Sequence, residues 1–438
     1  MGKVGRMSEL NLSIGPVDDE AGVRAWAASV PVQFPEGEGI AESNEQFIRR
    51  LPCAPINGAV AVKYFPSRKV EGKEPPGKRS WDCAQFLAAQ GIGTPEPVAL
   101  VQGDGEWLVT RELPAHDSFK SRLIDIYVNT HQCHDLIELL QEVADAVREL
   151  HAAGVMHGDL GNQNILLLRE PGDAPTVQFI DLNRARMRES LTLEERARDV
   201  SRIHLPSEFR RIFYEMLFEG EPPDVFKAAE RRIRRRFAWH TRTRRLRHPI
   251  RERRRARKRT GEDYPDALDM WIWDEKSMQA ITCLRSKERL TKVRPMELLR
   301  AGFFILRDFP RAWWLGRKME ADVFTAPVDM SGRLGCAVEP TEDRWQHERP
   351  LLEALPRSPV LIRFYHHAGA EQEERSATAI RDCAAAGFPV MVALVQCRRS
   401  VTDPSSWHAF CLRVLASVDG LVEEVEVGHA SSRVKWGS

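Results

Sequence analysis

The sequence lacks the features that mark a secreted, metal-stapled or membrane-spanning protein. Its eight cysteines form no C-x-x-C pair and no cluster flanked by histidines, so neither a zinc site nor a disulfide framework is expected. The sequence contains no run of about 18 apolar residues, the length needed to span a bilayer. The first residues, MGKVGRMSELNLS, contain no apolar leader. We therefore expect free thiols and a cytoplasmic protein, peripheral at most at the inner face of the cytoplasmic membrane.

An overall excess of charge is also absent, because the formal net charge is only +1. The distribution is nevertheless uneven. Residues 231–259 hold 16 Lys and Arg against one acid, Glu252, whereas the rest of the chain holds 48 basic and 62 acidic residues. Such asymmetry indicates an anionic partner at one location. A solvated helix face and nucleic-acid binding are the two other ordinary interpretations of the run.

The chain is long enough, at 438 residues, for two or three domains, and 42% apolar residues indicate a globular core. Its first part reads as a small sheet with one helix, followed by a mostly helical lobe that reaches about residue 260. The pattern predicts strands at 46–51 and 58–65, a helix at 79–91, a hairpin around 103–105, and a long amphipathic helix at 133–154.

The second part has a different pattern. Residues 273–320 read as a helical connector, and strands then alternate with helices, which is typical of a parallel α/β domain. The Trp-rich stretch 298–318 is interpreted as a domain-packing helix in preference to a membrane-interfacial one. The expected strands are 335–340, 359–367, 388–396 and 421–430, and the helices between them 344–355, 371–387 and 403–418.

The stretch HGDLGNQNILL, residues 157–167, carries chemistry. Phosphoryl transfer needs a carboxylate to accept the proton of the nucleophile, oxygen ligands for Mg²⁺, and a cation on the nucleotide phosphates. Asp159 and Asn164 have the spacing of the kinase catalytic loop H-R-D-L-x-x-x-N. Asp181 ends a predicted strand seventeen residues further on, and Lys63 lies on the strand AVAVKYF. We expect Asp159 to be the base, Asn164 and Asp181 to be metal ligands, and Lys63 to contact the phosphates.

Two further polar residues of the stretch have less specific roles. His157 is expected to hold the loop through hydrogen bonds, which is close to the role of an ordinary buried histidine. Asn162 could orient Asp159 or the acceptor, or it could be a plain turn residue. Each motif alone is weak, but their order and separations along the chain together favour a kinase-like site.

The motifs HGDLGNQNILLL and FIDLNRAR resemble those of the bacterial lipopolysaccharide core kinases, the Kdo and heptose kinase group. The resemblance covers roughly residues 45–255 and implies a compact protein-kinase-like fold. It also implies ATP and Mg²⁺ as cofactors, and a sugar hydroxyl of the lipopolysaccharide core, or of its lipid-linked precursor, as acceptor. The expected domains are an N-terminal extension (1–40), a kinase-like domain with a basic C-terminal helix (41–260), a connector (261–330) and an α/β domain (331–438).

The sequence departs from the protein-kinase pattern at several points. Gly158 stands at the position of the loop arginine, and Ser80 at the position of the glutamate that should pair with the lysine, where Asp82 or Glu71 could substitute. No G-x-G-x-x-G loop is present, so the phosphate lid is expected near 36–43. Without an A-P-E motif, protein kinase activity is not expected. A small-molecule phosphotransferase of the aminoglycoside or choline kinase type, and an inactive pseudokinase scaffold in envelope biogenesis, remain the alternatives.

The last part of the chain resembles the first four βα units of a glycosidase-like TIM barrel. The fold class expected is thus a bilobal α+β kinase-like domain followed by an incomplete (β/α) barrel-like domain, with an open sheet as the alternative. A sugar-binding or vestigial role is favoured over hydrolysis, because no carboxylate pair can be assigned. Polar residues gather at the predicted strand ends: Glu339, Arg363, His366, His367, Gln396, Glu426 and His429.

The arginine run suggests where an anionic acceptor could bind. Lipopolysaccharide precursors present phosphates at an anionic membrane surface, and arginine binds phosphate through two parallel hydrogen bonds. Phe237, Trp239 and His240, interleaved with the arginines, could enter the interface or pack on the helical lobe. We therefore expect acceptor and membrane contacts, and no nucleic acid, at one cluster of side chains: Arg251, Arg253, Arg254 and Arg255.

Overall fold

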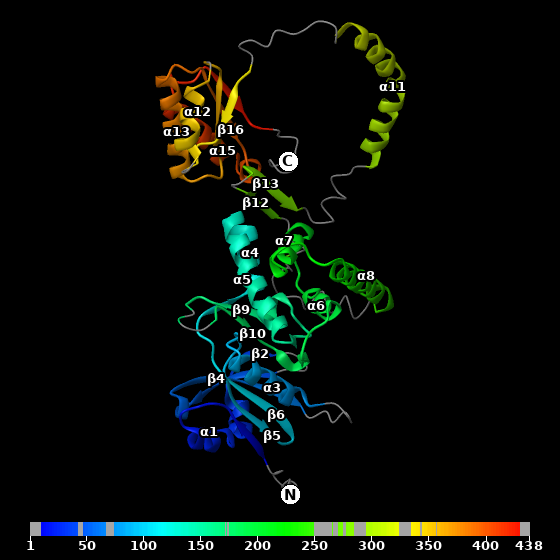
Figure 1. Ribbon diagram of the computed structural model, residues 1–438, viewed down its shortest axis with the longest axis vertical. Helices are drawn as coiled ribbons and strands as arrows, with labels where there is room; N and C mark the ends of the chain where they lie inside the picture. The colour runs from blue at the N-terminus through cyan, green and yellow to red at the C-terminus, as the bar shows by residue number, and fades with distance from the viewer. Residues whose placement is uncertain are drawn as a thin grey trace. The chain divides into compact units, whose positions relative to one another are not determined.

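Figure 1 shows the computed structural model of the chain. The structure describes residues 10–42, 47–66, 74–170, 172, 175–248, 265, 270–274, 277–283, 295–323, 334–341, 344–355 and 357–429. The chain divides into two compact units, residues 1–268 and 269–438. Among the described residues, no helix is both long and apolar enough to cross a membrane.

A six-stranded antiparallel sheet forms the first lobe of the first unit, in the order β1-β5-β6-β4-β3-β2. β1 lies in the segment expected to be an N-terminal extension, yet it pairs with β5, so the sheet begins before residue 41. The strands are β1 (Asn11–Ile14), β2 (Glu38–Glu42), β3 (Phe47–Cys53), β4 (Gly58–Pro66), β5 (Pro97–Gln102) and β6 (Gly105–Arg111).

Alternation along β4 decides which way each of its side chains points. Val60 and Val62 are buried in the core that the sheet forms with α1 (Glu20–Ala27) and α2 (Val30–Gln33). Phe65 packs on the other face, against Trp81 of α3 (Pro76–Ala89). Because side chains of a strand alternate with period two, Lys63 shares the face of Phe65 and points to the cleft between the lobes.

α3 lacks a side-chain N-cap of its own and is capped from the sheet. The carboxylate of Glu106, on β6, accepts the backbone N–H groups of Gly77 at 2.7 Å and Lys78 at 3.2 Å. A Cβ at position 77 would come within 2.8 Å of the Glu106 side chain, so glycine permits this close approach. The cap satisfies two otherwise orphaned N–H groups and fastens the helix to the sheet.

The second lobe is mainly helical, and α5 is its central element. The apolar residues of α5 recur at helical spacing, and Leu136, Leu140, Val143, Val147 and Leu150 are all fully buried. Two small antiparallel sheets, β10-β9-β7 and β11-β8, carry the polar loops between them. The elements are β7 (His116–Ser118), α4 (Phe119–Asp125), α5 (Cys133–Ala152), β8 (Val155–Met156), β9 (Ile165–Leu168), β10 (Val177–Phe179), β11 (Arg186–Met187), α6 (Leu193–Val200), α7 (Ser207–Leu217) and α8 (Asp224–Arg247).

The strongly basic helix α8 is anchored at its N-terminal half. Phe226 is fully buried, and the buried Glu230 accepts a hydrogen bond from Tyr214 of α7 at 2.8 Å and pairs with Arg234. Arg234 also donates to the carbonyl oxygen of Ile203 at 3.1 Å. α8 therefore has a defined position against α6 and α7, although most of its surface is charged.

The second unit contains a four-stranded parallel sheet in the order β14-β15-β16-β17. The alternating strands and helices predicted from the sequence are present, but in the described residues the sheet is open, and no closed barrel forms. The elements are β14 (Cys336–Val338), α12 (Arg344–Glu353), β15 (Val360–Tyr365), α13 (Ala370–Ala385), β16 (Val390–Val395), α14 (Arg398–Thr402), α15 (Pro404–Ser417) and β17 (Glu424–Val427).

A hairpin of β12 (Met270–Asp274) and β13 (Gln279–Cys283) occupies the start of the segment expected to be a helical connector. Its Trp271 and Trp273 pack with Tyr365 and Ala393 on one face of the parallel sheet, whose other face is covered by helices. Aromatic residues in alternation favour a strand, and this competing signal was missed. The helical prediction holds for the following α11 (Pro295–Val323).

Candidate active site

The cleft between the lobes of the first unit brings Lys63 and Asp181 together. The Lys63 Nζ lies 2.5 Å from Oδ1 of Asp181, and both side chains are largely shielded from solvent. Both line a cavity of about 400 Å³, together with Asn164 and Ser80. The apolar wall of this cavity includes Ile40 of β2, so part of the segment in which the phosphate lid was expected, residues 36–43, borders the cavity.

A left-handed turn presents Asp181 to the cleft. The residue has φ 64° immediately after β10, a backbone conformation that aspartate tolerates better than most side chains. The carbonyl oxygen of Ile180 accepts a hydrogen bond from Nε2 of His157 at 2.9 Å, while the N–H of Asp159 donates to Nδ1 at 3.3 Å. The Nε2 of His157 therefore carries the hydrogen, and the histidine connects the two polar segments.

Asp159 lies at the surface of the loop, beside two arginines. Its carboxylate is 3.1 Å from Arg184 and 3.8 Å from Arg202, and its backbone carbonyl accepts the amide N–H of Asn164 at 2.8 Å. Because the amide nitrogen of Asn164 is engaged in this way, the amide oxygen is the atom left for a cation. The motif spacing thus places a carboxylate and an amide oxygen on neighbouring sides of one loop.

Asp199, on α6, anchors this loop and was missed in the sequence. Its carboxylate accepts the N–H groups of His157 and Gly158, each at 2.8 Å, and lies 3.1 Å from Nε2 of His151. Burial opposes its ionisation, but the hydrogen bond and charge of His151, together with His157, hold the pKa of Asp199 below its ordinary value. The sequence contains one sign of this role: Asp199 is an acidic residue on the otherwise apolar face of the amphipathic segment 193–200.

Asn162 has a structural contact. Its amide exchanges two hydrogen bonds with the backbone of His204, at 2.9 and 2.7 Å. Only glycine fits at position 158 without strain. Its φ is 78°, and a Cβ there would lie 2.4 Å from the carbonyl oxygen of Arg184. The loop is thus held at both ends by hydrogen bonds, and Asp159 lies partly exposed between them.

No side chain of α3 supplies the acidic partner of Lys63. Ser80 is buried, and its hydroxyl donates to the carbonyl oxygen of Pro76 at 2.8 Å. Asp82 pairs with Lys78 on its own helix. Glu71 lies outside the described residues. Within the described part of the chain, the partner of Lys63 is therefore Asp181.

The donor set of the cleft fits Mg²⁺ bound together with a nucleotide. Asp181 and Asn164 supply one carboxylate and one amide oxygen to the same cavity. Among the described residues, no group of three or more His, Cys, Asp or Glu could hold a metal ion by itself. This is the pattern that suits Mg²⁺, which commonly takes one or two protein oxygens and completes its shell with phosphates and water.

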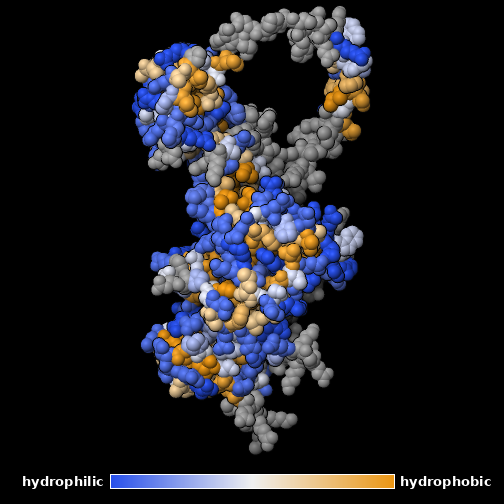
Figure 2. Space-filling view, viewed as in Figure 1, coloured by the Kyte–Doolittle hydropathy of each residue, from blue (hydrophilic) through white to orange (hydrophobic). Residues whose placement is uncertain are grey.

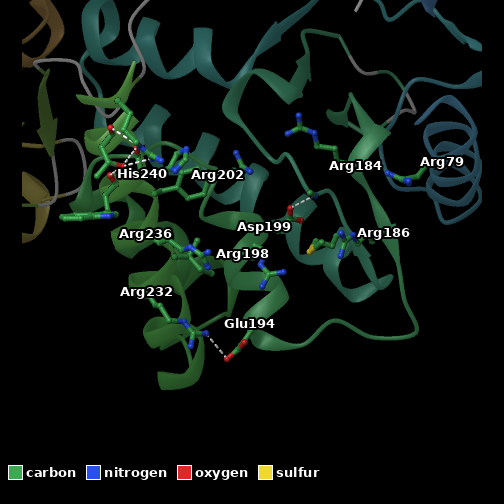
Figure 3. Close-up of a pocket in the computed structure, with 17 residues that line it drawn as sticks. Arg79, Arg184, Arg186, Glu194, Arg198, Asp199, Arg202, Arg232, Arg236 and His240 are labelled. Carbon is green, nitrogen blue, oxygen red and sulfur yellow. Dashed lines mark hydrogen bonds and ion pairs between the residues drawn. The ribbon is translucent and has the colours of Figure 1, made fainter. Parts of the chain in front are cut away.

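A second, larger cavity of about 1260 Å³ adjoins the catalytic loop, and we call it the arginine basin (Figure 3). Eight arginines line it, including Arg184 and Arg202, the two that approach Asp159. Other arginines of the lining come from α6 and α8. The ring-bearing side chains of Phe237, Trp239 and His240, all on α8, also line the basin. The cluster predicted to bind the acceptor (Arg251, Arg253, Arg254 and Arg255) lies outside the described residues.

Most of the strand-end residues predicted in the second unit pair with one another. Glu339 accepts hydrogen bonds from Arg363 at 2.5 Å and Tyr365 at 2.8 Å. His366 lies 2.7 Å from the hydroxyl of Ser400 and 3.0 Å from that of Ser406. Gln396 exchanges hydrogen bonds with the backbone of His429, whose ring lies 3.3 Å from Glu426. This network gives the sheet a polar edge, at which Glu339 and Glu426 both lie close enough to Arg363 to help raise its pKa.

A two-lobed domain with a sheet lysine, an Asp-x-x-x-x-Asn loop and a strand-end aspartate around one cleft belongs to the protein-kinase-like class of folds. The sequence model of the lipopolysaccharide kinase (Kdo/WaaP) family matches residues 73–213. The resemblance predicted from the motifs is thereby confirmed, and the matched segment contains Asp159, Asn164 and Asp181.

Two individual proteins show more limited similarity. A 52-residue segment is 38% identical to serine/threonine-protein kinase Pkn1 of Myxococcus xanthus, which is 12% of this chain and only 8% of the length of that relative. A solved structure, WaaP in complex with acyl carrier protein, is 20% identical with a TM-score of 0.39, covering 53% of this chain and 97% of that one.

Proposed function

We propose that the first unit is an ATP-dependent kinase that phosphorylates a sugar hydroxyl of the lipopolysaccharide inner core, on heptose or Kdo. One observation carries the proposal: the segment matched by the lipopolysaccharide kinase family model, residues 73–213, brings Asn164 and Asp181 into one cavity with Lys63 of β4, beside Asp159. These are the residue types that phosphoryl transfer requires.

The geometry supports a simple sequence of events. ATP binds in the cleft, and Lys63 exchanges its contact with Asp181 for the nucleotide phosphates. Asp181 and Asn164 would hold Mg²⁺, which neutralises charge on those phosphates. Asp159 accepts the proton of the acceptor hydroxyl as its oxygen bonds to the γ-phosphorus, and the bond to ADP breaks. His157 and Asp199 keep the loop in position.

The two alternatives differ in what the protein would do with ATP. A phosphotransferase of the aminoglycoside or choline kinase type would use the same cleft with a small soluble acceptor. A pseudokinase would not turn ATP over, and the absence of an acidic side chain facing Lys63 from α3 is the feature that favours it. Against it, Asp181 already orients the ammonium group in the cleft.

An acceptor screen tests the proposal. Purified full-length chain is incubated with labelled ATP and Mg²⁺, and with core oligosaccharides, aminoglycosides or choline as acceptors. Label transfer to a heptose or Kdo residue, located by mass spectrometry and lost in Asp159→Asn, is the expected result. Transfer to a small amine-bearing acceptor alone would favour the first alternative, and no transfer to any acceptor would favour a pseudokinase.

We further propose that the protein contacts an anionic membrane surface through α11. Large apolar side chains of this helix are exposed, among them Leu299, Phe303 and Trp313. Figure 2 shows hydrophobic residues, in orange, along the surface of α11. At 100° per residue, Arg300, Arg307 and Arg311 form one stripe beside the main apolar face, and Phe304 lies on the far side of this stripe. An apolar face with a basic border is typical of interfacial helices, and this exposure favours that interpretation over the domain-packing one.

Vesicle binding tests this second proposal. The double variant Trp313→Ser/Trp314→Ser should reduce co-sedimentation with phosphatidylglycerol vesicles about tenfold or more, because two interfacial aromatic anchors are lost. Phosphatidylcholine vesicles, which carry no net charge, serve as the control. Unchanged binding in the double variant would refute the role of α11.

A further inference from the structure

The arginine basin has no function assigned by the mechanism above. We propose that it binds an acceptor sugar through at least two anionic groups, phosphates or carboxylates, and that Arg184 and Arg202 make one of these groups a requirement for access to Asp159. The inference rests on the proposed function, because it names the substrate class of the same site.

The first observation is an excess of cations in one cavity. The acids that line the basin are Glu194 and Asp199. Glu194 pairs with Arg232 at 3.2 Å, and Asp199 is buried beneath the catalytic loop. Among the described residues, Arg186 and Arg236 form no ion pair, and Arg198 has only a longer-range attraction to Glu195. Guanidinium groups keep their charge at any physiological pH, so a cavity with this imbalance attracts anions.

The second observation is the arrangement of these arginines. Figure 3 shows Arg184 and Arg186 on one side of the basin, and Arg232 and Arg236 of α8 on the other. Arg198 of α6 lies between the two sides. Arginines on opposite walls suit an extended ligand with separate anionic groups, each bound bidentately, better than a single small ion.

The third observation is an aromatic surface within the same cavity. Trp239 is 69% exposed and Phe237 is 41% exposed, and both line the basin. The guanidinium of Arg202 lies 4.7 Å from the centre of the Phe237 ring. Aromatic side chains supply flat apolar area beside polar groups, which is the composition expected of a pocket for a sugar ring that carries charged substituents.

The fourth observation connects the basin to catalysis. Arg184 and Arg202 line the basin and also approach the two carboxylate oxygens of Asp159. Arg184 is 61% exposed, and ion pairs that water reaches contribute little net stability because the solvent screens them. An anionic group of the acceptor can therefore draw these guanidinium groups away from Asp159 at low cost and leave the carboxylate free to take the proton. A neutral acceptor offers no such exchange.

Matched acceptors test the proposal by kinetics. The full-length chain is assayed with a deacylated, phosphate-bearing core oligosaccharide and with the same molecule after phosphatase treatment and reduction of its carboxylates. We expect kcat/KM to be about 100-fold higher for the anionic form, since hydrogen bonds to charged groups contribute about 1.5–3 kcal/mol each. The assay is repeated with the same anionic acceptor embedded in vesicles. Comparing it with the soluble form distinguishes binding of the head group by the basin from a general effect of the membrane.

Two variants identify the residues. The double variant Arg198→Gln/Arg236→Gln should lower kcat/KM for the anionic acceptor about 10- to 100-fold, with the KM for ATP and turnover of the neutral acceptor unchanged. Arg184→Gln/Arg202→Gln should reduce the preference for the anionic form at least as much, a change of specificity that general damage would not produce. The control is Arg211→Gln/Arg235→Gln, because these exposed arginines on α7 and α8 do not line the basin.

A binding measurement does not depend on turnover. With the nucleotide site saturated by a non-hydrolysable ATP analogue and Mg²⁺, inorganic pyrophosphate should bind the wild-type chain and the control variant equally. It should bind Arg198→Gln/Arg236→Gln about tenfold more weakly. Equal turnover of the anionic and neutral acceptors would overturn the inference but not the kinase. Failure of all acceptors would refute the kinase, and pyrophosphate binding would then decide whether the basin is an anion site.

Discussion

The nucleotide cleft and the arginine basin adjoin the same catalytic loop but differ in charge balance. In the cleft, the single lysine is matched by Asp181 within 2.5 Å, and most of the lining is apolar. In the basin, eight arginines face two acids that are already engaged. The cleft can thus exist without its ligand at little electrostatic cost, whereas the basin favours an anion. Under the proposed function, we therefore expect binding of the acceptor to depend more on charge than binding of the nucleotide does.

The strongest test of this comparison is at Asp159, between the two cavities. Asp159→Asn should lower turnover about 100- to 10,000-fold, the usual contribution of a general base, while ATP affinity measured by fluorescence titration stays within a few-fold. Asp181→Asn should instead weaken binding of the Mg²⁺–nucleotide complex. Wild-type turnover in both variants would show that the site is misplaced.

Asp199 allows a test of how far the loop depends on its anchor. Asp199→Asn should lower the free energy of unfolding by about 3–5 kcal/mol, the usual cost of removing one partner of a buried charged pair. The amide would also present N–H groups to the backbone donors of His157 and Gly158. Chemical denaturation monitored by circular dichroism gives the value, and the exposed Asp104→Asn serves as the control.

The pH dependence of the same variant has a defined sign. The folded-state pKa of Asp199 is lowered from its ordinary value of 3.8, so its stabilising contribution is fully present above that value and is lost as pH falls below it. The difference in unfolding free energy between wild type and Asp199→Asn should therefore be constant near neutral pH and shrink below about pH 4. A difference that grew on acidification would contradict the assignment.

The two cavities also differ in how much of them could be predicted from the sequence. Asp159, Asn164 and Asp181 follow one another at fixed separations, and alternation along β4 directs Lys63 to them, so local patterns were enough. The basin depends on α6 and α8 lying side by side, a long-range contact that no spacing reveals. The sequence predicts an anion site at Arg251, Arg253, Arg254 and Arg255, which lie outside the described residues, but it does not reveal the basin lining that α6 and α8 form.

The fold shows the same division. Strands β3 to β6, helices α3 and α5, and the alternating elements of the second unit follow from periodicity and turn residues. The pairing of β1 with β5 was not predictable, because a four-residue edge strand has almost no pattern of its own. The hairpin β12–β13 was missed because Met270–Trp273 is a short, continuous apolar run, which fits a helix as well as a strand despite the alternation of its two tryptophans.

Lys63 and Ser80 give a smaller, more specific test of the nucleotide cleft. Lys63→Ala should lower kcat about 10- to 100-fold, as expected for loss of one or two charge-assisted hydrogen bonds to phosphate. Ser80→Ala should change kcat less than about threefold, because its hydroxyl bonds only to the carbonyl of Pro76 on its own helix. Steady-state kinetics at saturating ATP distinguish the two. A large effect of Ser80→Ala would mean that α3 contributes directly to phosphate binding.

The smallest effect is expected from removing the second unit, because both cavities lie in the first. A chain ending at residue 268 should fold, melt cooperatively, and keep its kcat/KM for a soluble anionic acceptor within about twofold, as expected of a compact domain. Activity on vesicle-embedded lipopolysaccharide should fall, because α11 is lost. In the full-length chain, changing Arg251, Arg253, Arg254 and Arg255 to Gln should also leave turnover of the soluble acceptor unchanged. Activity on vesicle-embedded lipopolysaccharide should fall in this variant, and the loss should be larger at low salt, where charges near a lipid surface act most strongly. If the shortened chain failed to fold, or lost its preference for the anionic acceptor, the two cavities would not form a self-contained site.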